Sequence, residues 1–309
     1  MKRYIGLFLL LLCASMAIAS PLGSSAKNAI PKQVQQIISV DYRSLKNSQT
    51  AMAMKERLLP DNLKQFETSL RNIGISPDTD LDQLTFATFR VDKSLRMVGI
   101  AQGNFPTKKI MQKLKVAKIK PVKVRTNNVW PMAGGMQMVF LDPTTLLFAE
   151  PGSLQAALAT YDGEGENLAY NREITDLVSS VDNSSVWSVL DQQGTQNLMR
   201  SALGDAAKLT DYEVVKKRLL ASRYTMDFGS GINFDLDVVT SDSITATTLS
   251  SLVKAGVMYR RMSGNSAEKM ALENVTVDSD SDRLRLHFRA DEKKFQSLLN
   301  TDLFAAVTR

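Results

Sequence analysis

The chain has very little of the residues that most often build reactive or cross-linked sites. Its 309 residues include one cysteine and one histidine, and only 7% are aromatic. A single cysteine excludes an intramolecular disulfide framework, and a single histidine excludes a metal site built from several histidines of this chain. Neither a phosphate-binding glycine loop nor a dinucleotide fingerprint occurs. The sequence therefore predicts no cofactor and no metal.

Long apolar runs are missing except at the amino terminus. There, Lys2 and Arg3 precede an apolar stretch at 4–14, and small residues at 17 and 19 place a cleavage site before Ser20. This order is typical of a secretory signal. It predicts a signal peptide at 1–19 and an exported protein that is periplasmic or extracellular.

Two other interpretations of this segment remain open. A transmembrane anchor needs about 20 apolar residues, and Ser15 interrupts the run. A lipid anchor on Cys13 would follow Leu12, where a small residue is usual. If residues 1–19 are removed, Cys13 is lost with them, and the formal net charge falls from +6 to +4 because Lys2 and Arg3 also leave. We expect no transmembrane helix in the mature chain.

The spacing of apolar residues predicts an α+β fold for residues 20–309. Residues 20–29 are small and polar and indicate a flexible lead. Alternating patterns predict strands at 34–41, 84–91, 96–102, 121–125, 129–132, 136–141, 145–149, 185–190, 222–228, 232–239, 272–277 and 283–289. Helical spacing predicts helices at 48–59, 61–73, 107–116, 153–161, 172–179, 195–203, 212–220, 243–261 and 293–299.

The order of these elements repeats along the chain. Each half gives strand, helix, two strands, helix and strand, which is the order of the ferredoxin-like βαββαβ unit. The loop at 162–166 combines two glycines with three acids and marks the boundary between the halves. We therefore expect two tandem ferredoxin-like units, at 30–166 and 167–309, each an antiparallel sheet covered by helices.

Short sequence pieces spread over most of the chain carry one resemblance. They are Ile30-Pro31 with the strand ending at Asp41, Phe66 with Gly74, Asp80-Leu81-Asp82, Gly103-Asn104-Phe105, Phe140-Leu141-Asp142 and Val186-Trp187. In these pieces the chain resembles a loose set of secreted bacterial proteins of unknown function with tandem ferredoxin-like units. The resemblance implies fold and export, and it implies no activity, because no catalytic motif belongs to it.

Two polar patterns near the carboxyl terminus are candidates for chemistry. His287 lies on an alternating strand that also carries Arg283, Arg285 and Arg289, and no nucleophile elbow accompanies it. The aspartates at 278, 280 and 282 begin like a calcium loop, but arginines stand where glycine and glutamate are needed. We predict a surface histidine and a solvated turn, and weak calcium binding stays open as an alternative.

One segment concentrates positive charge. Between 106 and 125 there are eight cations and no acid: Lys108, Lys109, Lys113, Lys115, Lys118, Lys120, Lys123 and Arg125. Such a cluster attracts phosphates, anionic headgroups or acidic wall polymers, and it is a candidate anion-binding patch. An exposed face that only maintains solubility is the alternative. The patch lacks the interleaved aromatic residues that bind nucleic acid, so nucleic acid is disfavoured as a partner.

These observations favour a non-enzymatic protein of the cell envelope. It would bind an envelope protein or ligand through a sheet face or the cleft between its units. Two alternatives remain open. One is an envelope hydrolase with a noncanonical carboxylate pair, because 32 acids offer many pairings in space. The other is peripheral binding of anionic membrane or wall polymer through 106–125.

Overall fold

The computed structural model describes residues 21–48, 51–52, 61–203, 212–229, 231–264, 266, 269 and 272–291. The expected signal peptide with Cys13, its cleavage site, and the helix expected at 293–299 lie outside these residues. Most of the helix expected at 48–59 does so as well.

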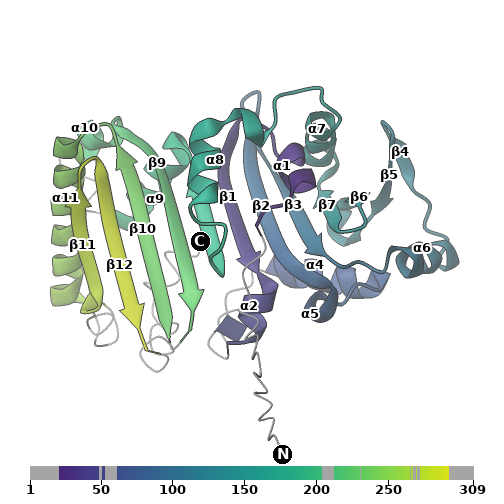
Figure 1. The fold of residues 1–309 in the computed structure, drawn as a ribbon, viewed down its shortest axis with the longest axis horizontal. Helices are drawn as coiled ribbons and strands as arrows, with labels where there is room; N and C mark the ends of the chain where they lie inside the picture. The colour runs from purple at the N-terminus through teal and green to yellow at the C-terminus, as the bar shows by residue number, and fades with distance from the viewer. Residues whose placement is uncertain are drawn as a thin grey trace, which may run out of the picture.

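The strands of the described chain form one antiparallel sheet, in the order β11-β12-β10-β9-β8-β1-β2-β3-β7-β6-β5-β4 (Figure 1). Their bounds are β1 Val34–Asp41, β2 Leu81–Val91, β3 Ser94–Gly103, β4 Val122–Val124, β5 Asn127–Pro131, β6 Gln137–Asp142, β7 Thr145–Ala149, β8 Val186–Leu190, β9 Leu219–Phe228, β10 Ile232–Thr240, β11 Val275–Asp280 and β12 Arg283–Ala290. β1 pairs with β2 on one side and with β8 on the other. Strands of the two predicted units therefore belong to a single sheet.

Helices lie on both sides of this sheet, so the predicted α+β class with antiparallel strands is confirmed. Their bounds are α1 Ser24–Ala29, α2 Tyr42–Lys46, α4 Asp61–Ile73, α5 Pro77–Asp80, α6 Thr107–Val116, α7 Pro151–Tyr161, α8 Arg172–Ser179, α9 Gln192–Leu203, α10 Tyr212–Lys216 and α11 Ser243–Ser263, with 3₁₀ turns η1 Ala133–Gly135 and η2 Leu168–Tyr170.

The amino-terminal half of the sheet is covered on both faces. One face packs against α1, α7 and α8, and the other packs against α4, α5 and α6. β7 shows the consequence in its sequence, because all five of its residues, 145–149, are buried and they form a nearly continuous apolar run. On the second face the ring of Phe148 stacks on Phe66 with centroids 3.8 Å apart. It lies where any side chain at Gly99 would stand.

Among the described residues, helices cover the carboxyl-terminal half of the sheet on one face only. Buried residues of β10, β11 and β12 pack with α9, α10 and α11, as Leu236, Val277 and Leu284 do. No helix of the described chain lies on the opposite face of β9 to β12 (Figure 1). Its strands alternate apolar and charged residues, which is the pattern of a sheet with one solvated face.

Local sequence signals explain where two predicted helices end. α4 ends at Ile73 and is followed by Gly74 at φ +94°, a conformation that glycine adopts without steric cost. α6 ends at Val116, and Lys118 at φ 55° closes it, with the amide of Ile119 donating to the carbonyl of Leu114 at 2.9 Å. This is a Schellman-type end. Residues 117 and 118 therefore form the turn that ends the helix, and 119–120 belong to no strand.

Other predictions need correction as well. The lead expected at 20–29 contains helix α1, because Leu22, Ala26 and Ala29 are buried in the core. The helix expected at 212–220 ends at Lys216, and β9 begins at Leu219. β11 begins at Val275, so the aspartates at 278 and 280 lie on a strand and only Ser281 and Asp282 form the turn.

Candidate functional site

The predicted cation segment lies at one end of the sheet. We call residues 107–131, which comprise α6, β4, β5 and their connections, the basic unit. β4 is the last strand of the sheet order, and α6 stands beside it away from the centre of the molecule (Figure 1). β4 and β5 form a hairpin in which Val122 faces Val129. Its turn is at 125–126, with Arg125 at φ 56°, and Asn127 and Asn128 belong to β5.

The structure brings the eight predicted cations together on this outlying unit. All of them are exposed: Lys108, Lys109, Lys113, Lys115, Lys118, Lys120, Lys123 and Arg125. Arg125 forms an ion pair with Glu164, and this hydrogen bond raises the pKa of Arg125 and lowers that of Glu164. Lys123 Nζ donates to the carbonyl of Thr126 at 2.7 Å. Within the described ranges, the other six lysines form no ion pair.

The first turn of α6 is electrostatically unfavourable. Pro106 is its N-cap and provides no side-chain hydrogen bond, and the first turn carries no acid. Lys108 and Lys109 stand there instead, beside the positive end of the helix dipole. The helix is stabilised by packing, since Ile110 and Leu114 are buried. The positive charge of the first turn is therefore unfavourable to the helix, whereas Lys113 and Lys115 in its last turn are favourable.

A small pocket lies between α6 and the hairpin. It has a volume of about 310 Å³ and is lined by Thr107, Met111, Thr126, Asn127, Asn128, Trp130 and Phe140. We call it the α6 pocket. The ring of Phe140 meets that of Phe105 edge-on, with centroids 5.9 Å apart, which fixes one wall against the core. The sequence did not reveal this pocket, because Trp130 and Phe140 read only as strand residues.

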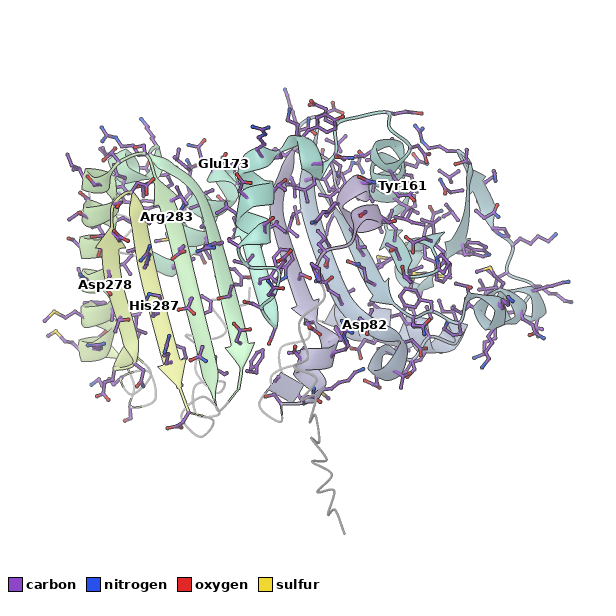
Figure 2. All side chains as sticks on the ribbon, viewed as in Figure 1. Asp82, Tyr161, Glu173, Asp278, Arg283 and His287 are labelled. Atoms are coloured by element: carbon purple, nitrogen blue, oxygen red, sulfur yellow. The ribbon has the colours of Figure 1, made fainter. Side chains whose placement is uncertain are left out.

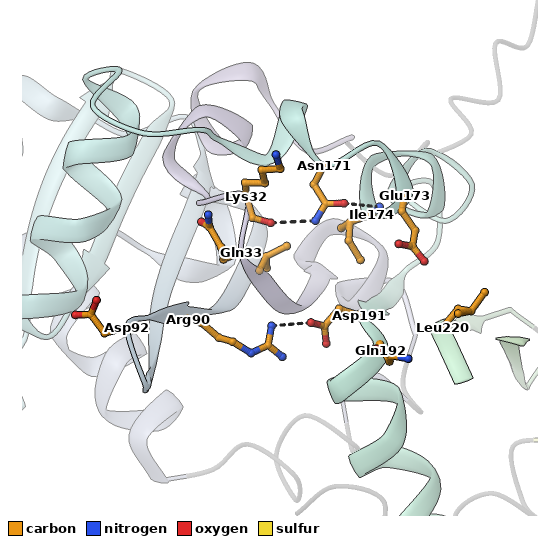
Figure 3. A pocket seen from close by; sticks show the side chains of 11 residues that line it. Lys32, Gln33, Arg90, Asp92, Asn171, Glu173, Ile174, Asp191, Gln192 and Leu220 are labelled. Atoms are coloured by element: carbon orange, nitrogen blue, oxygen red, sulfur yellow. Dashed lines mark hydrogen bonds and ion pairs between the residues drawn. The ribbon is translucent and has the colours of Figure 1, made fainter. Parts of the chain in front are cut away.

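A second cavity, of about 690 Å³, lies where the two halves of the sheet meet, and we call it the junction cavity (Figure 3). Its residues come from the start of β1, the ends of β2 and β8, and the starts of α8, α9 and β9. Across it Arg90 forms an ion pair with Asp191 at 2.7 Å, and its other amino group donates to Gln35 at 2.9 Å.

The polar groups of the junction cavity are largely engaged in holding the fold. The second oxygen of Asp191 accepts the amide of Gly194 at the start of α9. Asn171 donates to the carbonyl of Lys32 at 2.9 Å and also caps α8 (Figure 3). Lys32 Nζ pairs with Glu166 at 2.9 Å. No group of three metal-ligating side chains occurs among the residues that the structure describes. The cavity therefore helps to hold the two halves together, and the two other acids that line it, Asp92 and Glu173, are exposed.

The uncovered face of β9 to β12 carries alternating charges that pair with one another. We call the set Arg223, Asp235, Asp237, Asp280, Arg285 and His287 the charge ladder. Asp237, whose side chain is 12% exposed, accepts from Arg223 at 2.6 and 2.9 Å. Arg285 lies between Asp237 at 4.0 Å and Asp280 at 3.0 Å.

The histidine predicted on this face lies where the sequence placed it. His287 lies on β12, and Arg283 is the first residue of the same strand (Figure 2). Its Nδ1 contacts the carboxylate of Asp235, the residue directly opposite on β10. The acids of β10 are the members that the sequence did not associate with this face, because strand pairing brings them from about 50 positions away. The face is close to electrically balanced.

Comparisons with known proteins give a fold and no activity. No protein-family description matches the chain, and no curated protein does. Solved structures of TP0453 do match. Crystal form I has a TM-score of 0.50 at 9% identity and covers 93% of this chain and 98% of that chain. Crystal form III has a TM-score of 0.49 at 8% identity, with 91% and 98% covered. At such identity, form I shows a shared α+β fold alone.

The length and apolarity of the helices bear on one further prediction. Across the described part of the chain, no helix combines enough length with enough apolar residues to cross a bilayer.

Proposed function

We propose that the protein is a non-enzymatic binding protein of the cell envelope that holds an acidic partner through the basic unit. One observation carries the proposal. Six lysines of an outlying helix and its following loop are exposed, and within the described residues they have no counter-charge. An uncompensated cluster of one sign raises the local concentration of oppositely charged molecules and speeds their association.

The residue type narrows the chemistry of this partner. The free cations are all lysines, which act as mobile point charges on long stems, whereas arginine recognises single carboxylates or phosphates in fixed geometry. A row of point charges suits an acidic polymer or an acidic protein surface better than one small anion. The envelope location rests on the signal-like sequence at 1–19, which also removes the chain from nucleic acid.

The carboxylate hydrolase is the second candidate, and the junction cavity is the place that would favour it. Its volume lies in the range of small-molecule sites. Its most enclosed acid, Asp191, is however committed on one oxygen to Arg90 and on the other to Gly194. A general base needs a free oxygen that faces its substrate. The basic unit has free groups, and so it supports a function better.

The finer description of two tandem ferredoxin-like units also stays a prediction. Its support is the order of elements around two neighbouring strands. β1 and β8 lie side by side, and each is followed by helices, a two-stranded hairpin and a further helix. The hairpins are β2–β3 and β9–β10, and the helices after them are α6 and α11. On this description, α6 and α11 are equivalent elements.

A polyanion titration tests the proposal. Fluorescent heparin serves as the probe, and binding to the protein is followed by anisotropy at several salt concentrations. One triple variant replaces Lys108, Lys109 and Lys115 with Gln. The matched control replaces three exposed lysines elsewhere, Lys93, Lys217 and Lys254, with Gln and so removes the same charge.

We expect the α6 variant to bind heparin about tenfold to a hundredfold more weakly at low salt, since a lysine near an anionic surface contributes about 1 kcal/mol. The control should stay within about threefold of the parent protein. Equal losses in both variants would show that only net charge matters and would overturn the proposal. Tighter binding to phosphatidylserine vesicles than to heparin would transfer the basic unit to the membrane-surface alternative.

A further inference from the structure

We infer that the α6 pocket is a binding site for a planar aromatic group of an anionic ligand. The inference rests on the proposed function, because the same unit supplies the charge, and it adds the chemical class that the unit selects. Three kinds of observation support it: the apolar wall, the polar rim and the placement of the lysines.

The wall is apolar and partly uncovered. Met111, Trp130 and Phe140 are half-buried and pack against the core cluster beneath α6. Each leaves part of its surface facing the pocket. Two aromatic rings and a thioether form a surface on which a flat ring gains contact area and offset or edge-on stacking. Such exposed aromatic surface is costly in water, and a ligand ring would cover it.

The rim carries groups that hydrogen-bond in both directions. Thr107, Thr126, Asn127 and Asn128 contribute two hydroxyls and two amides to the lining. Asn127 donates weakly to Thr126 at 3.4 Å. Asn128 is exposed, and its side chain forms no hydrogen bond with another described residue. A few such groups around an apolar wall are the usual composition of a ligand pocket.

Positive charge stands on both sides of the opening. In α6, Lys108 and Lys115 lie three residues before and four after Met111, so helical geometry places all three on one stripe. In the hairpin, Lys123 is directly opposite Asn128, and Trp130 points to the same face two residues on. Charge complementarity therefore adds an anionic group to the ring that the wall accepts.

Size sets the upper limit of the ligand. At about 310 Å³ the pocket is at the small end of ligand sites, and it holds one or two fused rings. The anionic group of such a ligand would remain at the rim near Lys108 and Lys123.

The probe for this site is 8-anilinonaphthalene-1-sulfonate, an aromatic anion whose fluorescence rises in apolar surroundings. The chain has two tryptophans, and Trp187 is fully buried. In a Trp187→Phe background, the emission of Trp130 reports on the pocket directly. We expect saturable quenching of Trp130 together with a rise in probe emission, at one probe molecule for each protein.

Two substitutions test the pocket, and one controls for added bulk. Thr107→Phe fills the pocket, and Trp130→Leu removes its ring. Each should weaken probe binding about tenfold, which is the usual contribution of one stacking contact. Thr247→Phe adds the same side chain at an exposed position of α11 and should leave the probe affinity within about twofold. Far-UV circular dichroism checks that each variant keeps its fold.

The outcomes separate this inference from the proposed function. If neither Thr107→Phe nor Trp130→Leu changes the affinity for the probe, the α6 pocket is not its binding site. The heparin result is unaffected by that outcome. Heparin binding that ignores the lysine substitutions overturns the proposed function, whatever the probe does. If the pocket variants lower probe affinity while Lys108→Gln and Lys123→Gln do not, the site takes neutral rings, and the anionic class assigned here is wrong.

Discussion

Two charged regions of this protein differ in whether their charges are already paired. On the charge ladder, Arg223, Asp237 and Arg285 alternate across neighbouring strands within ion-pair distance. On the basic unit, lysines follow one another with one intramolecular ion pair, that of Arg125, among the described residues. Both regions are solvent-facing, and both stood out in the sequence as basic. Exposure alone therefore does not identify a binding surface. A charge that is already paired within the protein has replaced part of its hydration by a fixed partner, and it is less available to a ligand.

Removing an acid from the ladder tests this comparison with the largest expected effect. Asp237→Ala would leave Arg223, whose side chain is 25% exposed, with no counter-charge. We expect a loss of about 2 kcal/mol in the free energy of unfolding, measured by urea denaturation. Asp278→Ala, an exposed aspartate on β11, is the control and should change stability by less than about 0.5 kcal/mol. Equal effects would show that the ladder is a set of independent surface charges.

The pair at the junction cavity is expected to be intermediate. Arg90 and Asp191 have side chains 34% and 22% exposed, and they connect β2 to the end of β8. Arg90→Gln should therefore lower stability by about 1 kcal/mol. Lys93→Gln, at the exposed turn that follows β2, serves as its control. A loss as small as that of the control would mean that apolar packing alone holds the two halves together.

Local signals in the sequence predicted what depends on local structure. The bounds of α4, α6 and α8 follow from apolar spacing and from the residues that end each helix, and all three were predicted at 61–73, 107–116 and 172–179. Strands β1 and β10 were found within one residue of their bounds by alternation. In each case the signal and the element occupy the same short window.

Predictions that needed distant pairings were incomplete. The sequence around Ile37 does not indicate that Ile37 of β1 pairs with Val189 of β8. The single sheet was therefore not predicted. The acids that balance His287 and Arg285 come from β10, and the rings of the α6 pocket come from β5 and β6. The cations of the basic unit were found because they are contiguous. That six of them form no ion pair with any described residue could be recognised only once the surrounding chain was placed.

In the first turn of α6, a substitution can raise stability while it removes a positive charge from the basic unit. Lys109 is exposed beside the positive end of the helix dipole. Lys109→Glu should raise the free energy of unfolding by about 0.5 kcal/mol, because an acid in the first turn is favourable there. The same variant should bind heparin more weakly. A gain in stability with a loss of binding would show that the lysine is retained for contact and not for folding. A loss of both would indicate a structural role for Lys109.

The first turn of α11, unlike that of α6, is capped by a side chain, and its acid dependence gives the smallest expected effect. The amide of Thr245 donates to Asp242, and this hydrogen bond lowers the pKa of Asp242 to about 2. An aspartate in an unfolded chain has a pKa of about 3.9. The charged form is therefore favoured by folding, so its stabilisation is complete above about pH 5 and is lost as the pH falls towards 2.

Asn accepts the same hydrogen bond without titrating. Asp242→Asn should consequently match the parent protein only below about pH 2 and lose less stability between pH 5 and 2, as measured by urea denaturation. An unchanged acid profile would show that Asp242 has no part in it, and α11 would then begin, like α6, without electrostatic help.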